Sequence, residues 1–329
     1  MNPILVVGMN RGGTTMLGNV LCRHPQIAAP QHELHWGCKE CQVLLHKQYW
    51  PHFSDPEAYA DFLEQYSLGD YFVLARGDYD HFAESRPASF YEFYLELMDR
   101  FCAAEGASYW VMKIEERFYH YPGELQTFLD LLLDRYPQPR FIGILRDFEG
   151  VLKSHLRRQV SGEEIESAHR SLGQQKFALS QTLRYASQRP KIQRMIREQS
   201  GLMLTFREAT KEAERTNRAI CEYLGLEFAP EMLEREYEAN TSFKSSRERA
   251  EIIAPWQFAL LDKVARPVFE ALHPLGSAWR RMKDAGEEVT CPVSYRLRDA
   301  GLLPETAHRR QQAAENLAMT GPRSAHAAP

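Results

Sequence analysis

Short, fully apolar runs alternate along the chain with longer segments in which apolar residues recur every three or four positions. The short runs are typical of strands buried on both faces of a parallel sheet, whereas the longer segments indicate amphipathic helices. We therefore expect four strands, at residues 4–7, 110–114, 141–145 and 202–206.

Helices are expected between and after these strands. The first follows a glycine-rich turn and should end at His24-Pro25, because the residue before a proline avoids helical conformation. A polar stretch over residues 162–199 is expected to be helical but broken at Pro190. Gly225 is expected to end the helix that follows the fourth strand. The remaining helices are expected at residues 56–66, 89–104, 123–136, 148–159 and 255–272. A loop with a short helix is expected at 26–55, and a polar loop at 239–251.

Strands that alternate with helices predict an α/β fold, in which a central parallel sheet is flanked by helices on both faces. We expect a single domain over residues 1–304, with helical insertions at about 40–105 and 160–200. Residues 305–329 contain few large apolar side chains, so a disordered tail is expected there.

Composition is ordinary for a globular protein and removes several function classes. Hydrophobic residues make up 44% and charged residues 26% of the 329 positions. A net charge of −4 argues against a strongly basic nucleic-acid binder, while a local basic pocket stays open. The sequence shows neither a membrane span nor a secretory signal, and six cysteines in so long a chain do not indicate a disulfide scaffold. We therefore expect a cytoplasmic enzyme.

The glycine loop after the first strand carries the strongest chemical signal. Residues 8–15 have the outline of a phosphate-binding loop, in which backbone N–H groups at a helix start bind an anion. A loop that binds a nucleoside triphosphate has lysine directly after its second glycine. Here Thr14 follows Gly13, and Arg11 supplies the cation from inside the loop. The loop therefore predicts an anion site that is not built for a magnesium-bound triphosphate.

Residues 6–17, followed by His24-Pro25, resemble the first phosphosulfate-binding segment of sulfotransferases that use 3′-phosphoadenylyl sulfate. Gly12 stands where that family commonly has serine. A second segment also looks like this family, because the third predicted strand ends in Arg146-Asp147 and Ser154 lies eight residues after the arginine. In the family this element binds the 3′-phosphate.

A third and weaker similarity covers residues 204–208 together with residues 223–226. The family has Tyr-Glu-Asp in the first of these segments, and this chain has Phe206-Arg207-Glu208, which puts the role of the acid in doubt. The resemblance as a whole spans roughly residues 3–230.

The resemblance implies a sulfotransferase with a P-loop type of α/β fold and no required metal. It would move a sulfuryl group from 3′-phosphoadenylyl sulfate to a hydroxyl acceptor, either a small molecule or carrier-bound, and release adenosine 3′,5′-bisphosphate. The donor has two anionic ends, and each needs a cationic site. The residues expected to bind it are Arg11, Gly12, Gly13, Thr14, Thr15, Arg146 and Ser154, joined by Phe243 and Lys244 from a late polar loop.

Sulfuryl transfer needs a stabilised leaving phosphate and a positioned base. We expect Arg11 to stabilise the leaving phosphate, and Lys113 to contact the sulfuryl group or the acceptor, as a lysine does in many relatives. Residues 30–36 resemble a Pro-x-x-Glu-x-His-aromatic stretch of bacterial and tyrosylprotein-type sulfotransferases. This similarity makes Glu33 the first candidate for the base and His35 the second.

Three other interpretations stay open at this point. The chain is alternatively a P-loop kinase of small molecules, or a nucleotide-binding module without turnover. A zinc site is the third, because His32, His35, Cys38 and Cys41 are types of residue that bind zinc. Steps of three residues drift about 60° backward on a helix, so these side chains would meet only in an irregular loop. Neither the acceptor, whether phenol, sugar, lipid, polyketide or peptide, nor the oligomeric state follows from the sequence.

Overall fold

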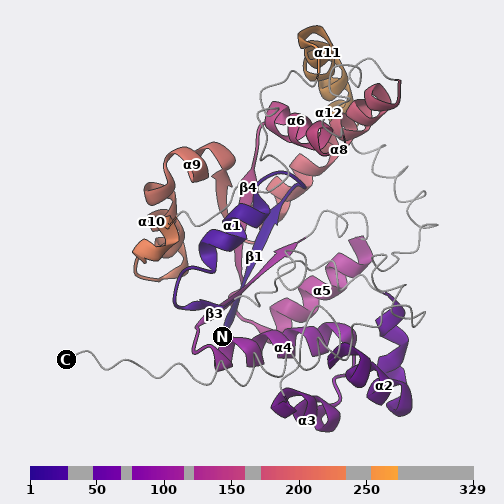
Figure 1. Cartoon of the computed structure of the whole chain (residues 1–329), viewed down its shortest axis with the longest axis vertical. Helices are drawn as coiled ribbons and strands as arrows, with labels where there is room; N and C mark the ends of the chain where they lie inside the picture. Colours follow the sequence, from indigo (N-terminus) through magenta and orange to yellow (C-terminus); the bar gives the residue numbers. More distant parts are fainter. Residues whose placement is uncertain (29–46, 68–75, 115–121, 160–171, 235–252, 273–329) are drawn as a thin grey trace, which may run out of the picture. The chain divides into compact units, whose positions relative to one another are not determined.

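The computed structural model describes residues 1–28, 47–67, 76–114, 122–159, 172–234 and 253–272 (Figure 1). Within this part of the chain, the described residues of 1–28 and 98–272 form a first unit, and those of 47–97 form a second unit. The two units are treated separately below.

A five-stranded parallel sheet lies at the centre of the first unit, so the predicted α/β fold is confirmed. The strand order is β2-β3-β1-β4-β5, and every neighbouring pair is parallel. Four strands correspond to the four expected ones, and the two-residue strand β2 was not expected. The bounds are β1 Asn2–Gly8, β2 Ile27–Ala28, β3 Tyr109–Ile114, β4 Arg140–Leu145 and β5 Leu202–Thr205.

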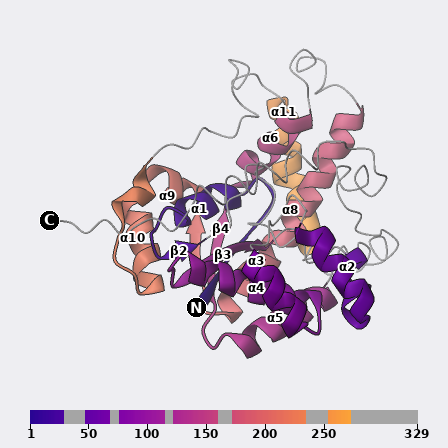
Figure 2. The same cartoon turned by 60° about the horizontal axis from the view of Figure 1, so that its bottom comes forward.

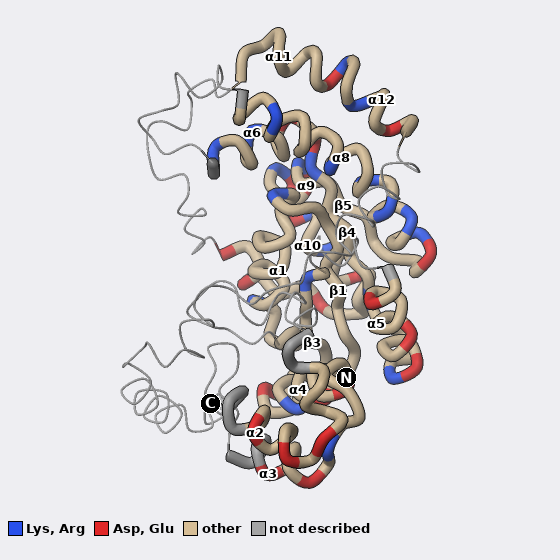
Figure 3. Tube along the Cα trace, turned by 90° about the vertical axis from the view of Figure 1, so that its right-hand side faces the viewer, with Lys and Arg blue, Asp and Glu red and all other residues tan. Residues whose placement is uncertain are grey.

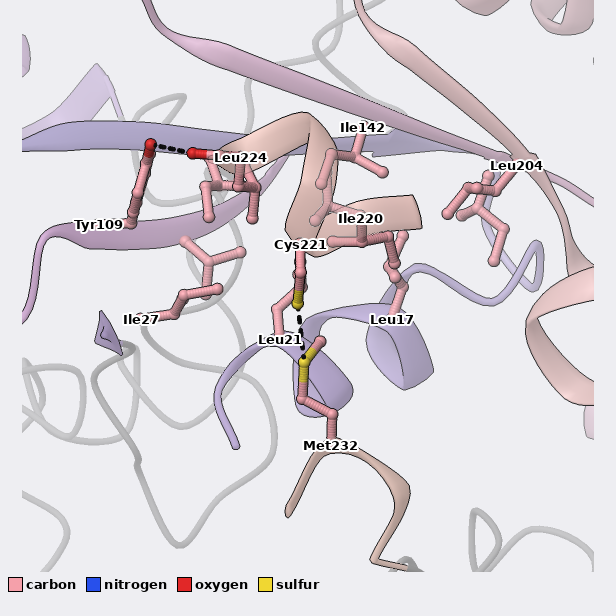
Figure 4. Packing of buried hydrophobic residues seen from close by; sticks show 14 of the residues in the cluster. Leu17, Leu21, Ile27, Tyr109, Ile142, Leu204, Ile220, Cys221, Leu224 and Met232 are labelled. Carbon is pink, nitrogen blue, oxygen red and sulfur yellow. Dashed lines mark hydrogen bonds between the residues drawn. The ribbon is translucent and has the colours of Figure 1, made fainter. Parts of the chain in front are cut away.

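One face of the sheet is covered by α1 (Thr14–Leu21), α10 (Ala213–Leu224) and the 3₁₀ turn η4 (Pro230–Leu233). Figure 2 shows α1 and α10 together on one side of the strands, with α8 on the other side. Because successive strand residues point to opposite faces, alternate positions of β1 and β4 enter this core. Its strand residues include Ile4, Val6, Ile142 and Ile144. Figure 4 shows Ile142 in this core together with Ile220 and Leu224 of α10.

The other face is covered by α8 (Leu172–Glu198), which packs against β4, β5 and β1. Gly143 allows the close approach, since a Cβ atom there would lie 2.8 Å from Cγ1 of Ile196. The predicted break at Pro190 is wrong, because α8 continues through it. Buried residues on both sides of the proline, among them Ala186 and Ile192, fix the helix against its neighbours. This packing outweighs the local preference of proline.

Most other helices of the first unit agree with the expected segments, but the single helix expected after the fourth strand is divided at Glu212 into α9 and α10. Gly225 ends α10 in left-handed conformation, with φ of 71°, as predicted. The helix expected at 255–272 contains a π-helical segment in its middle. The bounds are α5 Pro122–Arg135, α6 Phe148–Gln159, α9 Phe206–Lys211, α11 Pro255–Leu260, η7 Leu261–Ala265 and α12 Arg266–Ala271.

The second unit consists of η2 (Lys47–Ser54), α2 (Pro56–Ser67), α3 (Arg76–Ser85) and the first half of α4 (Phe90–Ala104). Aromatic rings fill its interior. The Phe82 and Phe93 ring centroids lie 4.5 Å apart, and those of Phe53 and Phe62 lie 5.0 Å apart. These rings form a hydrophobic core of this unit. None of the helices described is long and apolar enough to cross a membrane.

The start of α9 offers a stability test, because Thr205 and Glu208 form a reciprocal capping box. The Thr205 hydroxyl accepts from the backbone N–H of Glu208, and the Glu208 carboxylate accepts from the Thr205 backbone at 2.9 Å. Replacing Thr205 with Ala should lower the free energy of unfolding by about 1 kcal/mol in urea titrations at neutral pH. Thr127→Ala is the control. That hydroxyl donates to Gly123 within α5, so a change under about 0.5 kcal/mol is expected.

The capping box should also depend on pH. The hydrogen bonds from Thr205 hold the pKa of Glu208 below its ordinary value. Their stabilising effect is therefore complete at neutral pH and is lost as the pH falls through the lowered pKa. The stability difference between the wild type and Glu208→Gln should shrink on acidification. A difference that stays constant from pH 7 to pH 3 would contradict this role of the carboxylate.

Candidate functional site

Sheet topology brings two distant basic elements together. β4 lies beside β1, and Ile144 is in register with Gly8. Since both strands are parallel, the loop that follows Gly8 and the residue Arg146 emerge at the same edge of the sheet. Open α/β sheets bind their ligands at this carboxyl edge, next to the strand where the strand order reverses direction.

The glycine loop has an unusual backbone. Arg11 has a φ of 65°, which few residues other than glycine adopt, and Gly13 has a φ of 106°. The Gly12 N–H donates to Met9 O at 2.9 Å and closes the turn. No described side chain caps the start of α1, so the first N–H groups of this helix face the loop without a side-chain acceptor. A helix start of this kind binds anions.

Arg11 contacts both Ser154 and Arg146 directly. The Nε atom of Arg11 donates to Oγ of Ser154 at 3.0 Å, and Nη1 of Arg146 donates to the Arg11 carbonyl oxygen at 3.3 Å. Ser154 is buried, in the second turn of α6. The sequence analysis assigned Arg11 to one anionic end of the donor and the other two residues to the opposite end. The structure brings all three into one cluster.

Phe206 and Tyr185 hold Arg146 in place. The Phe206 ring lies under the guanidinium, with its centroid 4.4 Å from Cζ. The Tyr185 hydroxyl donates to the Arg146 carbonyl oxygen at 3.2 Å. Burial lowers the pKa of Arg146, the Asp147 charge opposes this shift, and the Arg157 charge adds to it. An anion that approached this guanidinium would be attracted by a partly desolvated charge.

Arg157 and Phe206 both lie beside Arg146. The sequence analysis missed Arg157, and it named Phe206 without a role in the site. Arg157 lies three residues after Ser154 on α6, and its Nε atom is buried with no hydrogen-bond partner among the described residues. Helical spacing was the signal for Arg157, because positions three apart share a face. Phe206 follows β5 directly, and its role becomes visible only once β5 is known to neighbour β4.

Lys113 lies beneath the start of α1. Its side chain is 3% exposed, and Nζ donates to Oγ1 of Thr15 at 3.0 Å. The aliphatic part passes Gly18, where a Cβ atom would lie 3.9 Å from Cδ. A buried cation thus supports the first turn of the helix that follows the glycine loop.

Two acidic residues near this edge of the sheet, Asp147 and Glu208, accept hydrogen bonds at the starts of helices. Asp147 accepts from the Gly150 N–H at 2.7 Å at the beginning of α6. Glu208, the acid whose role was in doubt, is part of the capping box of α9. The cluster of Arg11, Arg146 and Arg157 is therefore suited to bind an anion.

Several predicted site residues lie outside the described residues. They are Glu33, His35, Phe243 and Lys244, together with the other members of the alternative zinc set, His32, Cys38 and Cys41.

Comparison with protein families gives a match to the family described as "Sulfotransferase family" over residues 3–230. This range covers more than half of the chain and includes every described site residue named above. A search of curated proteins finds no match.

Solved structures similar to this chain include three bacterial sulfotransferase structures. The sulfotransferase domain of the Synechococcus PCC 7002 olefin synthase is 14% identical, with a TM-score of 0.41, over 87% of this chain and 95% of that one. The sulfotransferase domain of the curacin biosynthetic pathway is 14% identical, with a TM-score of 0.43, over 95% and 97%. Sulfotransferase STF9 of Mycobacterium avium is 17% identical, with a TM-score of 0.36, over 70% and 65%.

Close packing of the glycine loop on α9 can be tested at Gly13. A Cβ atom there would lie 2.5 Å from Cδ2 of Phe206, in addition to the strain of a positive φ. Gly106 is the matched control, since its φ is 66° and nothing lies within 4 Å of its Cβ position. Gly106→Ala should cost about 1 kcal/mol of unfolding free energy, and Gly13→Ala about 1–3 kcal/mol more. Equal losses in urea titrations would mean that Phe206 does not confine the loop.

Proposed function

Because the chain belongs to the sulfotransferase family, a family of transferases, we propose that it moves a sulfuryl group from 3′-phosphoadenylyl sulfate to a hydroxyl acceptor. The observation that carries this proposal is the direct contact of Arg11 with both Arg146 and Ser154 at the carboxyl edge of the sheet. Cations and a helix start at one edge match a donor that carries both a phosphosulfate and a 3′-phosphate.

The donor residues divide between the two anionic groups of the nucleotide. We assign the phosphosulfate to Arg11 and to the backbone of residues 12–15 at the start of α1. Arg146 and Ser154 would bind the 3′-phosphate, with Arg157 adding charge from the next turn of α6. Phe243 and Lys244 stay assigned to the nucleotide on the family resemblance alone.

Chemistry requires in-line attack of the acceptor oxygen on sulfur. A new sulfur–oxygen bond forms, the bond from sulfur to the bridging phosphate oxygen breaks, and the acceptor proton passes to a base. We assign the stabilisation of the leaving phosphate to Arg11 and the base to Glu33, with His35 as the second candidate. Lys113 stays assigned to the sulfuryl group or the acceptor on the family resemblance, and its contact with Thr15 places it at the start of α1.

Kinase chemistry is the less suitable use of this loop. A kinase loop reaches the β- and γ-phosphates with the lysine that follows its second glycine. Thr14 takes that position here and begins α1. The cation of the loop is instead Arg11, which contacts Ser154.

The acceptor side of the proposal extends the sequence analysis. We propose that residues 1–304 act as one sulfotransferase domain and that segments within 40–105 and 160–200 select the acceptor. The acceptor would be a small molecule or a carrier-bound group with a hydroxyl.

Donor binding is tested by thermal melts with adenosine 3′,5′-bisphosphate and, separately, with ATP and Mg²⁺. At about 100 times its dissociation constant, a ligand stabilises the folded chain by about 2.7 kcal/mol, which raises the melting temperature by several degrees. We expect this rise with the bisphosphate, and we expect Arg146→Ala to abolish it. Arg215→Ala, an exposed arginine of α10, is the control that should keep the full rise.

The opposite pattern of melting shifts would contradict the sulfotransferase proposal. A rise with magnesium ATP and none with the bisphosphate would favour a kinase. A bisphosphate rise that survives Arg146→Ala would place the nucleotide elsewhere.

The base is tested by turnover with labelled donor once an acceptor is found. Glu33→Gln should lower kcat by about 10²–10⁴-fold while the bisphosphate melting shift stays unchanged, because the base acts on the acceptor proton and does not hold the nucleotide. His35→Asn is measured in parallel. If only the histidine variant loses turnover, the base is His35; if neither does, neither residue is the base. Absence of turnover in the wild type with retained bisphosphate binding would favour a module without turnover.

A further inference from the structure

A pocket in the first unit lies between α6, α8 and the segment that begins at Ile253. Its volume is about 170 Å³. Leu156 of α6, Ala178 of α8 and Ile253 form its interior and are 1%, 4% and 7% exposed. Side chains from three separate parts of the chain thus build a defined apolar wall.

The rim of this pocket is apolar and open to solvent. Leu179, Trp256 and Leu260 line it and are 44%, 67% and 52% exposed. Figure 3 shows that α11 carries no charged residues. Large apolar side chains that gather around a hollow, instead of lying scattered, mark a binding surface.

The lining chemistry selects a neutral ligand. None of the described residues that line the pocket carries a charge, and the polar ones are three glutamines: Gln174, Gln175 and Gln257. Amide groups donate and accept hydrogen bonds, so they can bind a hydroxyl or a carbonyl group. They offer no countercharge, so an ionised ligand would lose its hydration without compensation.

Volume sets the size of the ligand. An apolar cavity of about 150 Å³ is large enough to hold benzene. The pocket, at about 170 Å³, therefore accommodates one aromatic ring with a small substituent. A longer ligand would extend over the rim at Trp256.

The pocket is separate from the anion site, although both use α6. Ser154 contacts Arg11, and Leu156, two positions later, lines the pocket. Residues two apart on a helix are related by a rotation of about 200° about the helix axis, so they point in nearly opposite directions. The anion cluster and the pocket therefore occupy opposite flanks of α6.

We propose that this pocket is a binding site for a small, neutral aromatic ligand of the phenol class, distinct from the nucleotide site on the other flank of α6. The ring would lie against Leu156, Ala178 and Ile253, with its hydroxyl near the glutamine amides. This site goes beyond the sulfotransferase activity and does not depend on it.

The test is a titration of the full chain with phenol in the absence of nucleotide, with binding measured by saturation-transfer NMR. The wild type should show saturable binding. Ala178→Leu fills the pocket and should weaken phenol binding about tenfold or more, because the ring loses the apolar contact it would bury there. Ala103→Leu makes the same change on an exposed position of α4 and should leave binding unchanged.

Two further variants make each outcome decisive. Leu261→Ala enlarges the pocket, so it should improve the binding of 2-naphthol relative to phenol even where Ala178→Leu fails to fold. Arg146→Ala should keep phenol binding while it loses the bisphosphate shift, which separates this proposal from the proposed function. No saturable binding in the wild type, or equal binding by the wild type and Ala178→Leu, would overturn the proposal. Loss of phenol binding in Arg146→Ala would overturn it too, because the ring would then lie in the anion site.

Discussion

Parallel pairing of β4 with β1 determines where the basic residues of this protein meet. Ile144 lies in register with Gly8, so the chain leaves both strands at the same level of the same edge. A parallel pair needs a crossover connection, and the long stretch of chain between these strands supplies it. Without this neighbourhood, Arg146 would not reach the Arg11 carbonyl oxygen, and Ser154 would not receive the Arg11 side chain. The strand pairing that builds the core of the sheet therefore also brings the residues of the anion site together.

The arginine cluster illustrates how like charges are held close together. Repulsion between Arg146 and Arg157, and the burial of Arg146, both oppose the charged state of Arg146. The Phe206 ring, the Arg11 carbonyl oxygen and the charge of Asp147 offset this cost. These contacts hold Arg146 in a defined position, so its charge is already placed at the carboxyl edge of the sheet. The proposed sulfuryl transfer would use this charge to bind its anionic donor.

Strands β1, β3, β4 and β5 and most helices were predictable, because short apolar runs and helical periodicity reflect burial directly. Pro190 was misjudged because the packing of α8 on the sheet is a tertiary effect that a local rule does not contain. The glycine loop led to Arg11, and the family resemblance led to Arg146 and Ser154. The contact between Arg11 and Ser154 depends on strand order, which the sequence pattern left open. The same holds for Phe206, whose position beside Arg146 follows from the pairing of β5 with β4. Glu33 and His35 rest on resemblance alone, since they lie outside the described residues.

The near contact of Gly13 with Phe206 links two positions that are far apart in the sequence. The aromatic ring occupies the volume that a side chain on the loop would take, so one space is shared by both positions. An aromatic residue at the start of α9 therefore requires glycine at position 13, whereas a smaller residue at 206 leaves that glycine acceptable. The dependence runs in one direction, because the positive φ of Gly13 disfavours a side chain there even without the ring. Homologous sequences should therefore keep glycine at position 13 wherever position 206 is aromatic.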